Sequence, residues 1–205
     1  ENGHLAANLP WPQSTQLYLP FNELSTDANG DTTTSFADFS GSNQSATCTT
    51  ATCPTAGNLG FTGSGLTFDG VDDELSVTSF IDPGSGSFTA AAWINVDSLV
   101  GTQTILSQQS GTTWLGVNGS GNLFTNLGGS LASSAAVTTG VWHHAAVTYD
   151  GSTLSLYLDG QLADSAATTV SASSGDLRLG LSETGGNRLA GGVDEIVVIA
   201  DAVST

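Results

Sequence analysis

Acidic and amide side chains gather in a polar stretch near the N-terminus, where their spacing could bind a cation. Asp27, Asn29, Asp31 and Asp38 occupy the first, third, fifth and twelfth places of a calcium-loop pattern. The pattern is imperfect, because Thr32 stands where the loop glycine belongs, the twelfth ligand is Asp instead of Glu, and no flanking helices are indicated. This loop is therefore the weaker of two Ca²⁺ sites that the sequence suggests.

Carboxylates arranged for glycoside hydrolysis are not evident in the sequence. Retaining hydrolysis needs two carboxyl groups about 5–5.5 Å apart, and alternate residues of one strand would share a face. The acidic residues here fall in turns instead, as at Asp150 and Asp159. His143 and His144 adjoin many serines, but nothing identifies a nucleophile or an orienting acid with them. We therefore expect no catalytic residues and a structural role for the histidine pair.

Charge and cysteine content limit the partners and the compartment. The formal net charge of −17 makes nucleic acid or an anionic membrane an unfavourable partner, and no apolar run is long enough to cross a bilayer. Cys48 and Cys53, with no histidine nearby, predict a local disulfide in preference to a zinc site. Because disulfides form in oxidising compartments, we expect a secreted or cell-surface protein.

Short apolar or alternating segments recur along the chain, whereas helical periodicity is nearly absent. Turn dipeptides such as Asp150-Gly151 separate them. A dozen short strands in 205 residues predict an all-β, two-sheet antiparallel sandwich or jelly roll. The expected strands are Leu17–Phe21, Leu66–Phe68, Glu74–Val77, Phe88–Val96, Thr104–Ser107, Trp114–Val117, Leu123–Asn126, Trp142–Tyr149, Leu154–Leu158, Gln161–Ala163, Leu177–Leu181 and Gly192–Ile199.

Two segments depart from the strand pattern. Residues 1–16 hold isolated apolar side chains among Asn and Pro, and we expect them to form an N-terminal arm or linker before a sandwich domain at 17–205. Residues 25–63 are polar, and a stretch of this length in a compact domain is expected to be a functional or metal-pinned loop. Because the chain starts at Glu1 without Met, we expect it to be part of a larger protein.

Strand alternation sorts the aromatic side chains between the two faces of a sheet. The apolar face of Phe88–Val96 predicts a core, which puts Trp93 on the outer face, and the same reasoning puts His144 and Tyr157 there. Trp114 follows a Gly-Thr-Thr loop signal, where a specificity residue could lie. These four side chains form the predicted ligand-binding set, since aromatic surfaces can stack on a sugar ring. The alternative is that they pack under a covering loop, such as residues 25–63.

Ordered motifs run through the chain from residue 17 and resemble those of laminin G-like jelly-roll domains in the concanavalin A-like lectin/glucanase superfamily. The resemblance implies a β-sandwich that binds glycans or proteins, often carries Ca²⁺, and sits in large secreted or surface proteins. Fold does not by itself fix function. The motifs are LYLPFNE (17–23), FADFSG (36–41), GSGLTFDGVDDELSV (63–77), FTAAAWINVDS (88–98), GVWHHAAVTYDGSTLSLYLDGQL (140–162) and RLAGGVDEIVVI (188–199).

The resemblance also yields the stronger Ca²⁺ prediction. In this topology the first and last strands lie side by side and antiparallel, which brings Glu23 near Asp194, two carboxylates that repel unless a cation lies between them. Asp38, from the family's Asp-x-Ser-Gly element, is the natural third ligand of a structural Ca²⁺ site. The alternative is that Asp194 caps a turn or accepts hydrogen bonds from backbone amides.

Two functions follow as expectations. The first is a non-catalytic extracellular recognition or adhesion module that binds a glycan or a surface protein and is stabilised by Ca²⁺. The second is a structural subunit of an extracellular fibre or surface layer, in which the segment Glu1–Gln13 pairs onto the sheet edge of another copy.

Overall fold

The computed structural model describes residues 14–26, 29–80, 85–108, 112–172, 175–182 and 184–203. The elements found there are all strands, and no described helix could cross a membrane. The strands are β1 (Thr15–Leu19), β2 (Ser35–Phe36), β3 (Ala46–Thr47), β4 (Thr55–Leu59), β5 (Ser64–Asp69), β6 (Leu75–Val77), β7 (Phe88–Val96), β8 (Gln103–Gln108), β9 (Thr112–Val117), β10 (Asn122–Thr125), β11 (Leu131–Ala136), β12 (His143–Tyr149), β13 (Thr153–Leu158), β14 (Gln161–Ala167), β15 (Leu177–Leu179) and β16 (Ala190–Ile199).

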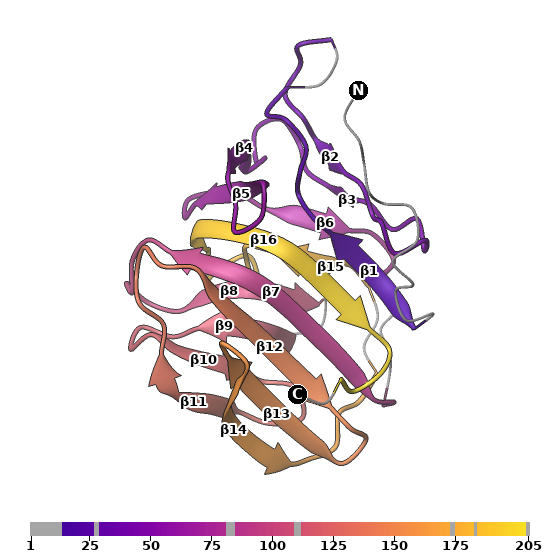
Figure 1. Ribbon diagram of the computed structural model, residues 1–205, viewed down its shortest axis with the longest axis vertical. Coiled ribbons are helices and arrows are strands. Elements are labelled where there is room, and N and C mark those ends of the chain that lie inside the picture. The colour runs from indigo at the N-terminus through magenta and orange to yellow at the C-terminus, as the bar shows by residue number, and fades with distance from the viewer. Residues whose placement is uncertain are drawn as a thin grey trace.

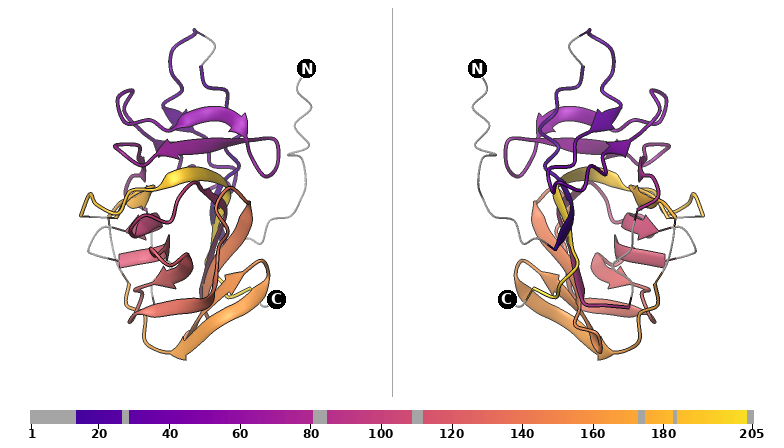
Figure 2. Two further views of the ribbon diagram at one scale, coloured as in Figure 1. Left: turned by 90° about the vertical axis from the view of Figure 1, so that its left-hand side faces the viewer. Right: turned by 90° about the vertical axis from the view of Figure 1, so that its right-hand side faces the viewer.

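The strands form two antiparallel sheets of eight strands each. The β7 sheet runs β14-β13-β12-β7-β16-β5-β4, and β1 also pairs with β16. The β8 sheet runs β11-β10-β9-β8-β15-β6-β3-β2. In Figure 1 the β7 sheet lies in front of the β8 sheet, and the side views of Figure 2 show the two layers facing each other. This architecture confirms the predicted two-sheet sandwich, including the antiparallel pairing of the first and last strands.

Every expected strand overlaps an observed one, and β7 has the predicted bounds. β1 begins at Thr15, two residues before its expected start. The prediction that residues 25–63 form one long loop is wrong, because β2, β3 and β4 lie within that range. These strands are hard to detect in the sequence because each buries a single side chain, as Ala56 does in β4.

The core lies between the two sheets, where alternate residues of the long strands meet. Phe88 of β7 is its aromatic centre, with ring centroids 6.0 Å from Tyr149 on the neighbouring strand and 5.4 Å from Trp114 of the opposite sheet. All three side chains are almost fully buried. A buried aromatic side chain contributes strongly to packing, so this contact ties the two sheets together.

Trp114 is therefore a core residue, and the prediction that it contacts ligand is wrong. Only 1% of its surface is exposed, and its ring also packs edge-on against Phe80. The pairing of β8 with β9 shifts register on both sides of Leu106, so simple alternation does not assign the faces of these strands. A loop signal just before a strand is thus a poor guide to exposure.

The predicted disulfide between Cys48 and Cys53 is present. It closes the turn that follows β3, and both cysteines pack against the core. The backbone N–H of Cys48 also donates to the carbonyl of Thr34 at 3.0 Å, which ties this turn to the chain before β2. The bridge therefore fastens a peripheral part of the β8 sheet.

Replacing both cysteines, as in the double variant C48S/C53S, should lower the free energy of unfolding by roughly 2 kcal/mol, because a short disulfide loop restricts the unfolded chain only modestly. The fold should survive, since the main core lies elsewhere. Chemical denaturation followed by circular dichroism measures the effect, and the wild-type protein under reducing conditions is the control. Complete unfolding of the variant would show that the bridge does more than fasten one turn.

Candidate functional site

Three aromatic rings from distant parts of the chain meet on the outer face of the β7 sheet. Trp93 of β7 and His144 of β12 are register partners, and their ring centroids lie 5.3 Å apart in an edge-on arrangement. The ring of Phe61, from the turn between β4 and β5, stacks on Trp93 at 3.4 Å with an interplanar angle of 9°. The expected covering of Trp93 by residues 25–63 is confirmed, yet Phe61 itself is 47% exposed. The stack therefore ends in solvent.

The turn that carries Phe61 is held down by a buried carboxylate. Asp194 of β16 is the register partner of Trp93 and is fully buried. Its Oδ2 accepts a hydrogen bond from the backbone N–H of Thr62 at 2.9 Å, and its Oδ1 accepts one from Glu195 N–H. At Gly60 a Cβ atom would lie 2.5 Å from Asp194 Oδ2, so only glycine lets the turn approach this closely.

Burial is the main influence on the acidity of Asp194. It raises the pKa of this carboxyl to about 6, the nearby charge of Glu195 adds to the rise, and the backbone N–H bonds from Thr62 and Glu195 oppose it. Glu195 in turn accepts a hydrogen bond at 2.5 Å from the hydroxyl of Tyr18, a residue of β1. Burial and this carboxylate raise the pKa of Tyr18 as well.

The aromatic face continues across β12 and β13. Tyr157 pairs with Ala146, which lies two residues from His144 and so on the same face. Burial lowers the pKa of His144, although the charge of Asp159 opposes the change, so the imidazole is neutral at neutral pH. We name the side chains of Phe61, Trp93, His144 and Tyr157 the outer aromatic face. It contains three of the four predicted ligand-binding residues, and Phe61 is the member that alternation could not find.

The two histidines of the Trp-His-His motif have different surroundings. His143 Nε2 accepts a hydrogen bond from the backbone N–H of Thr138 at 3.0 Å, and its Nδ1 lies 2.8 Å from Asp159 Oδ2. Asp159 Oδ1 also accepts from the N–H of His144. His143 thus joins two turns next to the outer aromatic face, which is the structural role expected for it.

The carboxylates of the stronger Ca²⁺ prediction are not brought together. Among the described residues, the oxygens of Glu23, Asp38 and Asp194 do not form a group within 4.8 Å of one another. They instead accept backbone N–H groups: Glu23 from Ala37, and Asp194 from Thr62 and Glu195. For Asp194, the alternative of bonding to backbone amides is confirmed.

Asp38 shows why an acidic residue in a loop need not bind metal. Its two carboxylate oxygens accept four hydrogen bonds, two from the backbone N–H groups of Tyr18 and Gln44 and two from the N–H and hydroxyl of Ser40. Of the weaker Ca²⁺ set, Asp27 lies outside the described residues. Asn29 and Asp31 lie in the loop closed by the bridge between Thr26 and Thr32.

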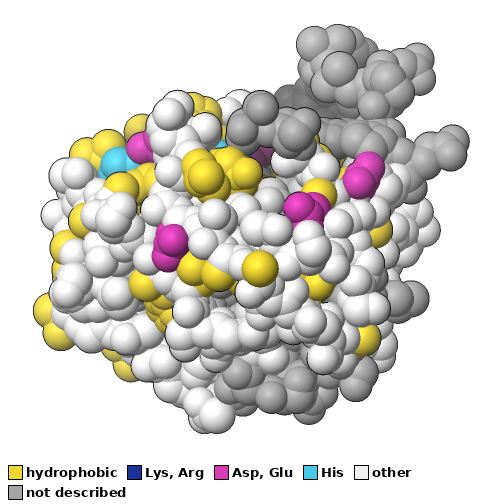
Figure 3. All heavy atoms as spheres, turned by 90° about the horizontal axis from the view of Figure 1, so that it is seen from below, with side chains coloured by type: hydrophobic (Ala, Val, Ile, Leu, Met, Phe, Trp, Pro, Cys, Tyr) yellow, Lys and Arg dark blue, Asp and Glu magenta, His cyan; other side chains and the backbone are white. Residues whose placement is uncertain are grey.

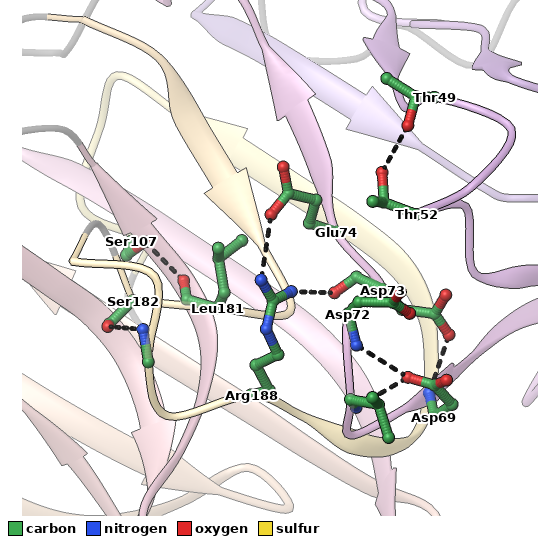
Figure 4. A network of polar contacts seen from close by, with 12 residues as sticks. Thr49, Thr52, Asp69, Asp72, Asp73, Glu74, Ser107, Leu181, Ser182 and Arg188 are labelled. Carbon is green, nitrogen blue, oxygen red and sulfur yellow. Dashed lines mark hydrogen bonds and ion pairs between the residues drawn. The ribbon is translucent and has the colours of Figure 1, made fainter.

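A different acidic group has a geometry that could hold a metal ion. Ligand oxygens of Asp69, Asp72 and Asp73 lie within 4.8 Å of one another at the turn after β5, in the Phe-Asp-Gly-x-Asp-Asp motif (Figure 4). Asp69 Oδ1 accepts from the N–H of Val71, which lowers the pKa of that carboxyl, whereas burial raises the pKa of Asp73. Arg188 donates to the carbonyl of Asp73 at 3.3 Å.

The sequence of residues 69–205 matches a laminin G-like family model, described as "Concanavalin A-like lectin/glucanases superfamily". The chain belongs to this superfamily. The resemblance expected from the ordered motifs is thus confirmed. No curated protein matches the chain by sequence.

Solved structures share the fold at low identity. Domain 4 of AbnA, a GH43 extracellular arabinanase from Geobacillus stearothermophilus solved with arabinotriose, gives a TM-score of 0.69 at 16% identity and covers 93% of this chain and 94% of that one. Trypanosoma rangeli sialidase gives a TM-score of 0.67 at 19% identity, and the match covers 93% of this chain and 31% of the sialidase. The binding domain of Paraclostridial Mosquitocidal Protein 1 gives a TM-score of 0.66 at 14% identity, and the match covers 93% of this chain and 50% of that one. The chain thus spans about a third of the sialidase, and these similarities establish the fold alone.

The raised pKa of Asp194 predicts a specific pH dependence. The folded protein binds this proton more tightly than the unfolded chain, whose carboxyl titrates near 3.8. Asp194 therefore adds stability that is complete below the unfolded pKa and is lost as pH rises through about 6. This difference corresponds to roughly 3 kcal/mol.

The variant D194N, which cannot titrate at this position, should lose that part of the pH dependence. The free energy of unfolding, measured by denaturation across this pH range, should vary less in D194N than in wild type. Asp97, an exposed carboxylate, provides the control D97N, which should keep the wild-type profile. Parallel profiles for D194N and wild type would contradict the assignment.

Proposed function

We propose that this domain is a non-catalytic glycan-binding module of a secreted protein and that the glycan lies on the outer aromatic face. The observation that carries this proposal is the half-exposed ring of Phe61, supported from beneath by Trp93. A sugar presents apolar C–H groups on one face of its ring, and a fixed, flat aromatic surface complements them. Because the ring of Phe61 is packed on Trp93 and its turn is tied to Asp194, little conformational entropy is lost on binding.

The outer face continues beside the stack with an amide and a further indole. Asn95 follows Trp93 by two residues on β7 and so shares its face. Its Oδ1 is buried and has no hydrogen-bond partner among the described residues. The neighbouring Gly192 leaves room for the indole of Trp142, which would lie 2.8 Å from a Cβ atom there. Trp142 therefore adds aromatic surface next to the stack, and the Asn95 oxygen lies beneath the surface.

Similar proteins support a glycan as the ligand. Domain 4 of the Geobacillus arabinanase, which matches nearly end to end, was solved with arabinotriose. Two further observations support the rest of the proposal. The disulfide fits an oxidising compartment. Asp194, which accepts the N–H of Thr62 beneath the aromatic stack, is fully buried and bound to backbone N–H groups, which suits structure better than acid–base catalysis.

The variant F61A should weaken glycan binding by roughly tenfold or more, because it removes the ring that contacts the sugar. Binding is measured by glycan array and then by calorimetry on the best ligand. Val100 is 84% exposed on a loop after β7, so V100A is the matched control for loss of an exposed apolar side chain and should bind as wild type does. Equal affinities for F61A and wild type would place the ligand elsewhere.

Calcium belongs to the proposal as a structural ion, with Asp69, Asp72 and Asp73 as its ligands. Three carboxylates so close together repel unless a cation or a hydrogen-bond donor offsets their charge. The ion would bridge the turn between β5 and β6.

Millimolar Ca²⁺ should raise the melting temperature above its value in EDTA, by an amount equivalent to about 2.7 kcal/mol when Ca²⁺ is at a hundredfold excess over its dissociation constant. D72N should respond less, since Asp72 is exposed and its replacement leaves the buried Asp73 in place. D201N, at an exposed acidic position outside every predicted Ca²⁺ site, is the control and should respond as wild type does. If Ca²⁺ leaves the melting temperature of the wild-type protein unchanged, the metal is removed from the proposal.

The alternative of a structural subunit rests on the segment Glu1–Gln13, which lies outside the described residues. It stays a prediction. Size-exclusion chromatography of the chain with and without this segment tests it, because assembly through the arm should disappear when the arm is removed.

A further inference from the structure

We infer that the outer aromatic face selects uncharged glycans and rejects those that carry carboxylate, sulfate or phosphate groups. This inference rests on the proposed function, since it names the class of sugar that the same face would accept. It follows from where the charged side chains of the domain lie.

Cations are missing from the surroundings of the outer aromatic face. The chain has two basic residues, Arg178 and Arg188, and no lysine. Arg178 lies in β15 of the opposite sheet, paired with Ser76 and Ser107. Arg188 donates to the carbonyl of Asp73, and its other guanidinium nitrogen lies 3.6 Å from Glu74 (Figure 4). An anionic sugar on the face would therefore find no basic side chain to pair with.

The histidine on the face does not supply that charge. His144 is the one imidazole in direct contact with the aromatic stack among the described residues. Burial lowers the pKa of this histidine, so the ring is uncharged at neutral pH. The neutral ring can donate a hydrogen bond to a sugar hydroxyl or accept one from it, but it cannot act as a counter-ion for a carboxylate.

Carboxylates, in contrast, surround the face on several sides. Asp194 lies beneath the turn of Phe61, Glu195 follows it in β16, and Asp159 bonds to His143 and to the N–H of His144. The surface seen from below likewise carries Asp and Glu side chains and shows no described Lys or Arg (Figure 3), so the excess of acidic groups extends to that end of the molecule. A second anion brought here would lose its hydration and meet like charge, which costs binding energy and gives specificity.

What the face does offer matches an uncharged sugar. Phe61 and Trp93 supply aromatic surface for C–H groups, while His144 and Tyr157 supply a neutral imidazole and a hydroxyl. Such groups bond to sugar hydroxyls as well as to water, so hydroxyls lose little on leaving solvent. The contacts offered to neutral sugars and the repulsion of anionic sugars by the carboxylates thus both favour a neutral polysaccharide of pentoses or hexoses.

The test uses glycan pairs that differ by one charged group: neutral oligosaccharides with their uronic acid, sialylated and sulfated counterparts. They are arrayed in EDTA so that no metal bridges an anion to the protein. At low salt the neutral members should bind more tightly by roughly tenfold or more, because like charges oppose the anionic ones. Added salt should narrow the gap, since exposed charges are screened.

Two lysine variants separate a local from a global charge effect. Thr62 is exposed beside Phe61, so T62K places a cation next to the stack and should raise binding of anionic members relative to neutral ones. Ser134 is exposed on β11 of the opposite sheet, so S134K changes the net charge equally but should leave the preference intact.

The outcomes distinguish failure of the inference from failure of the proposed function. If no glycan binds, or if F61A binds as wild type does, the proposed site is wrong. If glycans bind and F61A removes the binding, but anionic members bind as tightly as neutral ones, the site stands and the inference falls. Equal effects of T62K and S134K would also overturn it, because they would show that the overall charge decides.

Discussion

The buried carboxylate of Asp194 is the interaction on which the outer aromatic face depends. It lies in β16 beside Trp93 and accepts the N–H of Thr62, so it fixes the turn between β4 and β5 against the sheet. Leaving water costs a carboxylate free energy, which explains the raised pKa, and backbone N–H groups offset part of that cost. The register of β16 against β7 shifts just after Asp194, where Glu195 has a positive φ of 52°. A local irregularity of β16 thus helps to position an aromatic ring that lies in the turn between β4 and β5.

The fold was predictable from the sequence where strands are long and bury one face. β13 alternates cleanly between buried and half-buried residues, and the apolar face of β7 follows from the same period-two spacing although both faces of its first five residues are buried. β4 was not predictable, since only Ala56 is buried there and Gly57, at φ 80°, marks a register shift against β5. Edge strands of this kind are defined by a neighbour in space, so their own residues carry little signal.

The site was predictable in part for the same reason. Alternation places Trp93 and His144 on one face, and the register of β7 with β12 brings the rings together. Phe61 could not be found this way, because its position depends on a turn fixed by a residue far along the chain. The prediction for Trp114 was wrong because it rested on a loop signal before the residue, whereas the side chain is buried in a strand whose pairing shifts register. Sequence spacing reports the period of a strand, but not its bulges.

The acidic residues show how composition can mislead about chemistry. A large surplus of carboxylates suggests cation sites, yet Asp38 and Asp194 serve as acceptors for backbone N–H groups that would otherwise be unpaired in tight turns. Neutral side chains do the same in other turns, where Asn118 Oδ1 accepts the N–H groups of Ser120 and Asn122, but only the carboxylates bring a charge with them. Carboxylates that complete turns leave their charge in place, and that charge extends over the neighbouring surface. The same residues that shape the turns of this domain thereby set the field in which any ligand must bind.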